Sequence, residues 1–440
     1  MSKILLKIAP PVMLAQLIQA LYNIVDSAFI GRFSDSGLTA LSIIFPIQLL
    51  MIALAVGTGV GLNTVIAAKL GVGEEEKARE YAGVGTPLAL LLWVVFAAVC
   101  HAIMPLFARL SASSPEIVAD VVSYGRIVCV FSVGLFLEST WSKILQARGD
   151  MRTPMLAQIL GAVTNLALDP ILIFGFWRIP ALGITGAAIA TVAGQTVAAL
   201  VVMKRALYRP PAVRKFPHYA GRIFRLGAPS ILMQAAYTLY IFGLNLILST
   251  FSEAAVTVLG LYYKWQSFFF IPHGAMQTCI VPVISYNYAA GKYARCKHTL
   301  NVAILFSAVL MLFGILFFEA FPELLLRFFS SDEEVVRIGI PAFRIIGTSF
   351  LPITLSLTYP VLFQAVGQSF KSSVLTVVRT VLLFVPLAYL FSRIGLTWFW
   401  LTYPITDGIT AVLGFVLTRN FFKKLIPGEE KNVQRIVEKK

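Results

Sequence analysis

Two aspartates lie inside long apolar stretches of the chain: Asp26 in YNIVD (22–26) and Asp169 in NLALDP (165–170). A charge at the centre of a membrane-spanning helix costs about 3 kcal/mol or more, so such groups usually line an ion or proton path. Two carboxylates with little water around them can hold a proton between them, and their oxygens also suit a hard cation such as Na⁺. The alternative is that each aspartate caps a kink or bonds a neighbouring helix.

Other polar side chains share the helical faces of these two acids. In the first stretch, four residues fall at i, i+3, i+4 and i+7 and share one face: Gln19, Tyr22, Asn23 and Asp26. Asn165 lies one helical turn before Asp169. At 1.5 Å per residue both acids lie roughly 8–12 Å below the outer membrane surface, and Thr191 reaches a similar depth. We therefore expect one cation- or proton-coupling site, made of Tyr22, Asp26, Asn165, Asp169 and Thr191.

The composition shows that the surrounding elements belong in a membrane. The 440 residues are 58% hydrophobic and only 13% charged, with a mean hydropathy of +0.82. Soluble proteins have about 25% charged residues, so a water-soluble enzyme is excluded. Apolar stretches long enough to cross a bilayer recur along the chain. They predict an all-α polytopic membrane protein with twelve helices, near 8–31, 38–63, 83–106, 119–146, 154–176, 182–203, 227–250, 256–285, 299–321, 338–365, 373–392 and 396–418.

The distribution of positive charge predicts the orientation. The net charge is +15, and seven Lys or Arg residues gather in each of the segments 204–225 and 419–440. This positive-inside bias predicts an even number of spans, with both termini cytoplasmic in the inner (plasma) membrane. Anionic lipid headgroups are a sufficient partner for these charges, so we expect no nucleic acid. We also expect the N-terminal run to be a retained first helix, because Pro10 and Pro11 interrupt it and it continues to Asp26.

The two halves of the chain repeat with a separation of 218 residues. Lys7, Pro11, Gln16 and Tyr22 match Arg225, Pro229, Gln234 and Tyr240, and LQARG (145–149) matches FQAVG (363–367). Beyond this span the separation is 212, where GIT (183–185) matches GLT (395–397). The repeat predicts two pseudo-symmetric six-helix lobes, 1–203 and 226–420, joined by a cytoplasmic linker at 204–225 and followed by a basic tail at 421–440.

The repeat also predicts that the ionisable site is confined to the N-terminal lobe. At the same separation, the counterparts of Asp26, Asn165 and Asp169 are Leu244, Leu383 and Leu387. Isolated polar residues and aromatics elsewhere are typical of a substrate pathway, although lipid-facing or structural roles are the alternative. The candidate pathway residues are Gln19, Asn23, Glu138, Tyr237 and Gln266, with the roles of Lys264 and Asp407 left open.

The scattered cysteines and missing motifs narrow the function further. Cys100, Cys129, Cys279 and Cys296 lack the spacing of a disulfide framework or a metal site, so we expect no cofactor and no structural metal. HExxH, GxSxG, GxxxxGK[ST] and DDxxD patterns are absent, which argues against a membrane-embedded enzyme.

Several motifs together resemble the multidrug and toxic compound extrusion (MATE) family over residues 5–420. They are PPVMLAQLIQALYNIVDSAFIG, GVGEEEKA, ILQARGDMRTP, NLALDPILIFG and GITGAAIAT. The resemblance implies two six-helix bundles forming a V and efflux of organic cations driven by inward Na⁺ or H⁺. The acid pair is similar to the DinF-like branch, which implies a substrate contact at Gln19 and a first-helix bend at Pro11. The glutamate that the NorM-like branch carries in its seventh helix has no equivalent in PSILMQAAYTLY (229–240).

The combined prediction is a secondary active exporter of organic, cationic and amphipathic compounds in exchange for H⁺ or Na⁺. Its partners would be the small-molecule substrate and the lipid bilayer, and we expect a monomer. One alternative is a lipid-linked sugar flippase of the same superfamily, which should gather Arg or Lys in its cavity to bind pyrophosphate. Another is an exporter of one specific metabolite.

Overall fold

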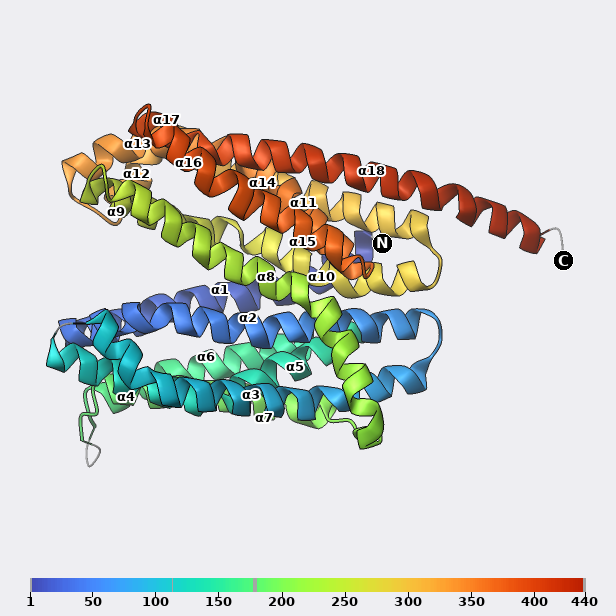
Figure 1. Cartoon of the computed structure of the whole chain (residues 1–440), viewed down its shortest axis with the longest axis horizontal. Coiled ribbons are helices and arrows are strands. Elements are labelled where there is room, and N and C mark those ends of the chain that lie inside the picture. Colours follow the sequence, from blue (N-terminus) through green and yellow to red (C-terminus); the bar gives the residue numbers. More distant parts are fainter. Residues whose placement is uncertain (1, 113, 177–179, 438–440) are drawn as a thin grey trace. The chain divides into compact units, whose positions relative to one another are not determined.

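The computed structural model describes residues 2–112, 114–176 and 180–437, and it is helical along nearly all of that length (Figure 1). Within the described part, nine helices are long and apolar enough to cross a membrane. Three pairs of helices bent by 40–54° each make one further span, which brings the number to twelve. The predicted all-α, twelve-span architecture is therefore confirmed.

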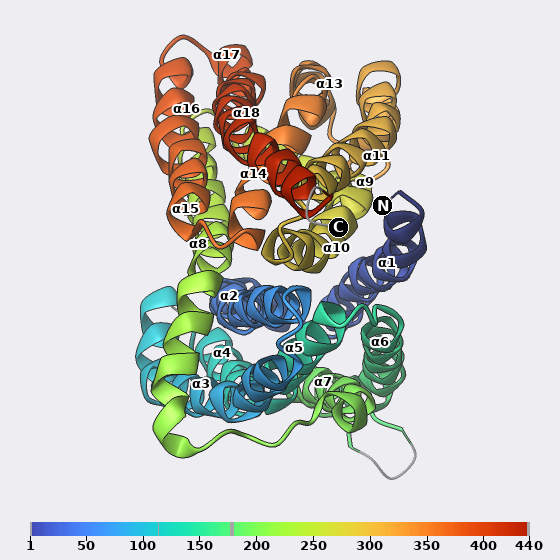
Figure 2. The same cartoon turned by 90° about the vertical axis from the view of Figure 1, so that its right-hand side faces the viewer.

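The N-terminal half contains seven α-helices and ends in a short 3₁₀ turn, η1 (Val213–Lys215). The helices are α1 (Ser2–Phe33), α2 (Asp35–Gly71), α3 (Glu75–Ser111), α4 (Pro115–Val130), α5 (Val133–Ala147), α6 (Arg152–Ile173) and α7 (Ile184–Ala206). Within this half α7 packs against both α5 and α6, as Figure 2 shows. Those three helices, with α1, carry the candidate site.

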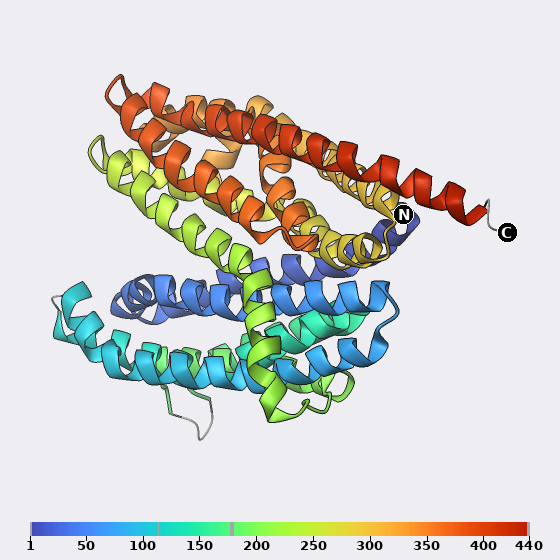
Figure 3. The same cartoon turned by 45° about the vertical axis from the view of Figure 1, so that its right-hand side comes forward.

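The helices of the C-terminal half are interrupted more often than those of the N-terminal half. Its elements are α8 (Phe216–Leu248), α9 (Glu253–Phe269), α10 (Ile271–Ala289), α11 (Tyr293–Ala320), α12 (Pro322–Arg327), α13 (Glu333–Gly347), α14 (Phe350–Ala365), α15 (Ser369–Val377), the π-helix η2 (Val378–Phe384), α16 (Val385–Ser392), α17 (Leu396–Trp400) and α18 (Thr402–Val437). The long α18, red in Figure 3, packs along α14 and η2. It runs on through most of the segment predicted as a tail.

Local side-chain chemistry accounts for the breaks that the hydrophobic pattern does not predict. Ser132 and Ser349 lie between the helices of two bent pairs, and each hydroxyl donates to a carbonyl three residues earlier, at 2.7 Å. Such local bonds compete with the helical ladder and bend it. In the third bent pair, Pro272 occupies the first turn of α10, where a proline favours the start of a new helix.

The contacts divide the chain into two units, Pro10–Gln234 and Met1–Ala9 with Ala235–Lys440. The boundaries fall inside two helices, α1 and α8, rather than in the predicted linker. Both helices carry prolines near the change of unit, at Pro10 and Pro11 in α1 and at Pro229 in α8. A proline removes a backbone hydrogen bond and so weakens a helix at that point.

Candidate functional site

The start of α6 is fixed by a dense set of hydrogen bonds around Asp150. The Asp150 carboxylate accepts from the backbone N–H groups of Arg152 and Thr153 at 3.1 and 3.0 Å, and from the Thr153 hydroxyl at 2.6 Å. Arg205, from the end of α7, lies 3.5 Å from the same carboxylate. Burial alone would raise the pKa of Asp150, but these hydrogen bonds and the charge of Arg205 outweigh it and hold the pKa below its usual range. The cap ties α6 to α7 and sets the position of the acid further along α6.

Two close-packed glycines bring α6 and α7 together near the middle of the unit. A Cβ added at Gly161 would lie 2.8 Å from the Gly194 carbonyl oxygen, and one at Gly194 would lie 2.6 Å from that of Gly161. Small residues at a helix–helix contact let the backbones approach closely. This contact places Thr191, on α7, one turn before Gly194 and beside the polar face of α6.

The two aspartates predicted to converge lie side by side in the structure. The carboxyl groups of Asp26 on α1 and Asp169 on α6 are within hydrogen-bonding range of each other. Asn165 donates its side-chain N–H to Asp169 Oδ1 at 3.4 Å. Asp169 is fully buried, and Asp26 Oδ1, Asp169 Oδ2 and Asn165 Oδ1 have no partner among the described residues. Buried polar atoms are normally paired, so this cluster of acceptors is suited to a proton or a cation.

A cavity of about 110 Å³ lies beside this acid pair. It is lined by Gln19, Tyr22, Leu135, Glu138, Gln158, Gly161, Ala162, Asn165, Thr191, Gly194, Gln195 and Ala198. Drug-sized ligands generally occupy about 300–1,000 Å³, so in this conformation the cavity can hold a ring or a cationic head group rather than a whole amphipathic compound. Of the predicted residues, it brings together Gln19, Tyr22, Glu138, Asn165 and Thr191.

Glu138 is the carboxylate that lines this cavity. Its Oε1 accepts a hydrogen bond from the Ser142 hydroxyl, one turn later on α5, at 2.6 Å. Tyr22 lies close enough to interact electrostatically with Glu138 as well as with Asp26 and Asp169. The phenol of Tyr22 is therefore near both the acid pair and the acid of the cavity.

Residue-type arguments missed several members of the site. Tyr124 on α4 is buried and accepts a hydrogen bond from Gln48 on α2 at 3.3 Å. Its hydroxyl also lies within hydrogen-bonding range of Thr191 and near Asp26. Gln158 and Gln195 line the cavity beside Gly161 and Gly194. Amides next to glycines on otherwise apolar helices were the available signal for this pair.

Other predicted residues lie elsewhere. Tyr237 and Gln266 belong to the C-terminal unit and do not line the cavity. The first is partly exposed and packs edge-on against two other tyrosines, while the second is buried at the end of α9. The side chain of Asn23 is outside the described part of the structure. Lys264 places its ammonium 5.0 Å from the Phe329 ring centroid, outside the cavity.

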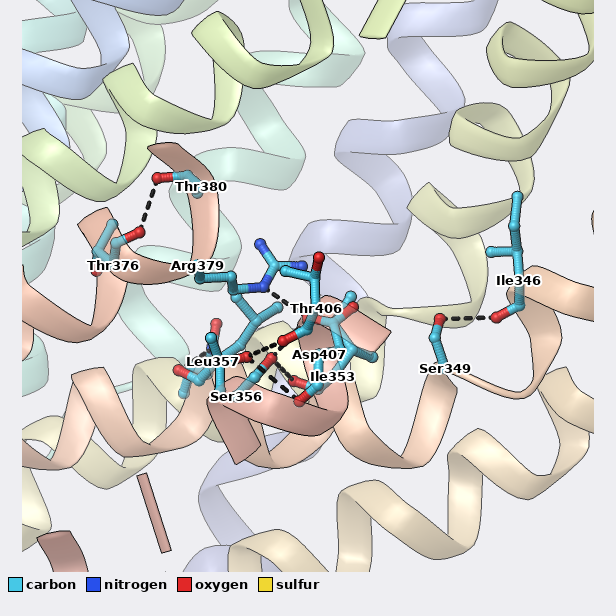
Figure 4. Close-up of polar contacts among 12 residues, drawn as sticks. Ile346, Ser349, Ile353, Ser356, Leu357, Thr376, Arg379, Thr380, Thr406 and Asp407 are labelled. Atoms are coloured by element: carbon cyan, nitrogen blue, oxygen red, sulfur yellow. Dashed lines mark hydrogen bonds and ion pairs between the residues drawn. The ribbon is translucent and has the colours of Figure 1, made fainter. Parts of the chain in front are cut away.

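Outside the predicted coupling site of the N-terminal lobe, ionisable side chains are also buried in the C-terminal unit, and they include Asp407, whose role the sequence leaves open. In the C-terminal unit Arg379 Nε donates to Asp407 Oδ1 at 2.7 Å, and both side chains are buried (Figure 4). The Ser356 hydroxyl donates to the same oxygen at 2.9 Å. Neither Arg379 nor Asp407 is a repeat counterpart of the N-terminal acids and amide, whose counterparts are Leu244, Leu383 and Leu387. The two charges of the C-terminal unit lie at other positions of the repeat.

Comparison with known proteins identifies the family. The MatE family model matches residues 11–171 and 229–390, one match in each half. The chain belongs to the MatE family. The two matches begin 218 residues apart (229 − 11), the same separation as the internal repeat. MATE proteins are membrane transporters and not enzymes, so the expected transporter class is confirmed for this chain.

Relatives of this MATE protein match over nearly their whole length. The chain is 26% identical to the FAD transporter of Shewanella oneidensis, covering 95% of this chain and 94% of that protein. It is 25% identical to a probable multidrug resistance protein NorM of Thermotoga maritima, covering 98% and 95%. Among solved structures, an outward-facing multidrug resistance MATE transporter is 26% identical, has a TM-score of 0.90 and matches 97% of each chain. The relatives support an exporter.

Proposed function

We propose that this MATE protein exports organic cations through the cavity of the N-terminal unit, in exchange for protons taken up by Asp26 and Asp169. The observation that supports this most strongly is the carboxyl pair beside a cavity that has its own carboxylate. The pair supplies a site for the driving ion, and Glu138 supplies a negative charge for the cationic head of a substrate. Tyr22 and Asn165 line the cavity and lie next to the pair, so they link the two events.

The coupling needs the ion and the substrate to favour different conformations of the same unit, since a ligand shifts an equilibrium only by its differential affinity. Proton binding between the two carboxyls removes a negative charge next to Tyr22 and so lowers the affinity of the cavity for a cation. Loss of the proton restores that affinity. We place the accompanying bend of α1 at Pro11, next to the change of contact unit.

Protons suit the geometry better than Na⁺. Two carboxylates within hydrogen-bonding range repel each other unless a proton or a cation lies between them, and a proton needs no oxygen besides those of the pair. Na⁺ would recruit several oxygens around itself, of which Asp26 Oδ1, Asp169 Oδ2 and Asn165 Oδ1 are the unpartnered ones here. Comparing a pH gradient with a Na⁺ gradient tests this preference directly.

The test uses the purified full-length protein in liposomes that contain ethidium as the cationic probe. An imposed pH gradient should drive transport of ethidium, whereas a Na⁺ gradient of the same size at constant pH should not. Asp26→Asn and Asp169→Asn should each lower the proton-driven rate at least tenfold. The matched control is Asp332→Asn, an exposed cap of α13 that asparagine can also serve.

The outcomes separate the parts of the proposal. Transport driven by Na⁺ alone would overturn the choice of ion, and transport indifferent to both gradients would overturn antiport. Equal rates in the Asp26→Asn variant and the wild type would show that the acid pair is structural. If ethidium is not transported but a flavin nucleotide is, this chain shares the substrate class in the name of its Shewanella relative.

The lipid-linked sugar flippase is the weaker candidate. A pyrophosphate-binding cavity needs Arg or Lys in its wall, and the residues that line the cavity of the N-terminal unit include none. The acid Glu138 would repel such a group. We further propose that the protein is a monomer in the plasma membrane, since one chain contains all the residues of the proposed site.

A further inference from the structure

The buried ion pair of the C-terminal unit occupies the repeat positions of the cavity in the N-terminal unit. With the separation of 218 residues, Glu138 corresponds to Ser356 and Gly161 to Arg379. With the separation of 212 that applies after the loop, Gln195 corresponds to Asp407. Three cavity-lining residues of one unit therefore match the three members of the hydrogen-bonded cluster of the other (Figure 4). Because the two units are copies of one fold, the cluster marks the place where a second copy of the cavity would lie.

Larger side chains fill this second copy. Gly161 and Gly194, which let α6 and α7 touch, correspond to Arg379 and Thr406. The counterpart of α6 is interrupted at this point by the π-helix η2, which contains Arg379. A π-helix carries an extra residue per turn and often occurs where a helix adapts to a functional group.

The surroundings of Arg379 are those of a bound planar cation. Its guanidinium carbon lies 5.8 Å from the ring centroid of Tyr240 and 5.2 Å from that of Phe384. Its Nε donates to Asp407, which is held in place by Ser356. Tyr240 is the repeat counterpart of Tyr22, so the same aromatic position faces the cavity in the other unit. A carboxylate, a hydroxyl and aromatic faces are what a guanidinium ligand needs for binding.

We propose that the C-terminal unit keeps the second cavity as a binding site for planar guanidinium-type cations, and that Arg379 occupies it as a ligand supplied by the chain itself. Two buried acceptors of the site have no partner among the described residues, Asp407 Oδ2 and Thr406 Oγ1. A free methylguanidinium ion has the same planar set of N–H donors as the arginine side chain, and without the tether it can turn to reach such atoms. The unit is thereby held in its ligand-bound state, while the N-terminal cavity remains free to fill and empty.

The experiment is chemical rescue of Arg379→Gly, which introduces the residue present at the corresponding position of the N-terminal unit. The variant removes the tethered cation and leaves Asp407 buried without its partner, so the Tm of the full-length protein in detergent should fall by roughly 10 °C. Methylguanidinium chloride at millimolar concentration should restore about half of that fall by binding only the folded state. The Tm of the wild type should not respond, because its site is filled.

Three comparisons make the test specific. Methylammonium chloride has the charge without the planar fork, and urea has the planar shape without the charge; neither should restore the variant. The double variant Arg379→Gly with Asp407→Asn should not respond to methylguanidinium. Rescue by all three solutes alike, or no rescue by any, overturns the proposal.

A further variant covers the case in which Arg379→Gly does not fold. Arg379→Lys keeps a tethered charge but loses the fork, so its Tm should lie clearly below that of the wild type, without a response to methylguanidinium. A Tm equal to that of the wild type would overturn the proposal, because an ammonium group would then stabilise the site as well as a guanidinium does. The result does not depend on whether the N-terminal cavity exports cations, so it can fail or succeed separately from the proposed function.

Discussion

At the scale of single residues, the proposed function assigns to Glu138 the charge preference of the cavity in the N-terminal unit. It is the carboxylate of the lining, and one of its oxygens is held by the Ser142 hydroxyl at 2.6 Å. Glutamine can accept the same hydrogen bond, so Glu138→Gln removes the charge with little change of shape. This makes the substitution a test of charge recognition rather than of packing.

We expect Glu138→Gln to weaken the binding of a monovalent cation such as ethidium about tenfold. A hydrogen bond to a charged partner contributes about 1.5–3 kcal/mol, and 1.4 kcal/mol is a factor of ten in affinity. Binding of a zwitterion should change less than threefold, which fluorescence titration of the purified protein can resolve. Glu253→Gln, at an exposed position, is the control. An equal loss for both ligands would mean that Glu138 supports the structure rather than recognises charge.

The sequence could predict which residues lie together when they are one or two helical turns apart on the same helix. Tyr22 and Asp26, or Asn165 and Asp169, share a face because helical spacing alone puts them there. That α1 and α6 would meet was an inference from matched depth, and the structure agrees. Arg379 and Asp407 are 28 residues apart on separate helices. Their pairing follows from packing, which periodicity does not encode.

At the scale of the helices, the contact between Gly161 and Gly194 sets the distance between α6 and α7. We expect Gly161→Ala to destabilise the protein by about 1–3 kcal/mol, because the new Cβ would lie 2.8 Å from a backbone oxygen that cannot move aside cheaply. Ethidium binding should weaken as well, since both glycines line the cavity. The measurements are the Tm in detergent and the same fluorescence titration.

The matched control is Gly221→Ala in α8, where an added Cβ would meet nothing within 4 Å. There alanine should leave the Tm unchanged or raise it slightly, because it favours helix more than glycine does. If both substitutions have the same effect on the Tm, the close contact of α6 and α7 is not what fixes their spacing.

The helices themselves were largely predictable, and their interruptions were not. Hydropathy located each of the twelve spans, because the length of an apolar stretch is a property of the sequence alone. The bends at Ser132 and Ser349 depend on single hydroxyl–carbonyl bonds, and the π-helix around Arg379 depends on a partner in α18. Neither changes the average hydropathy of its segment.

At the scale of the whole molecule, the distribution of charge predicts which ends of the helices face the cytoplasm. The linker around Arg214 is rich in Lys and Arg, which predicts a cytoplasmic position, whereas the turn at Ser331, between α12 and α13, falls on the opposite side by helix count. Both residues are exposed, and the four native cysteines are buried. Single added cysteines should therefore report their own side of the membrane with little background.

We expect a membrane-impermeant maleimide to label Ser331→Cys in intact cells, and to label Arg214→Cys only after the cells are permeabilised. Labelling of the unsubstituted protein under both conditions measures the background from the buried cysteines. The opposite pattern would invert the molecule and place the acid pair nearer the cytoplasm, so that protons would reach it from the wrong side for export. Labelling of both positions in intact cells would mean that an even number of spans separates them, instead of the three that the twelve-span arrangement places between the linker and the turn at Ser331. The two cysteines thus test the orientation on which the direction of transport depends.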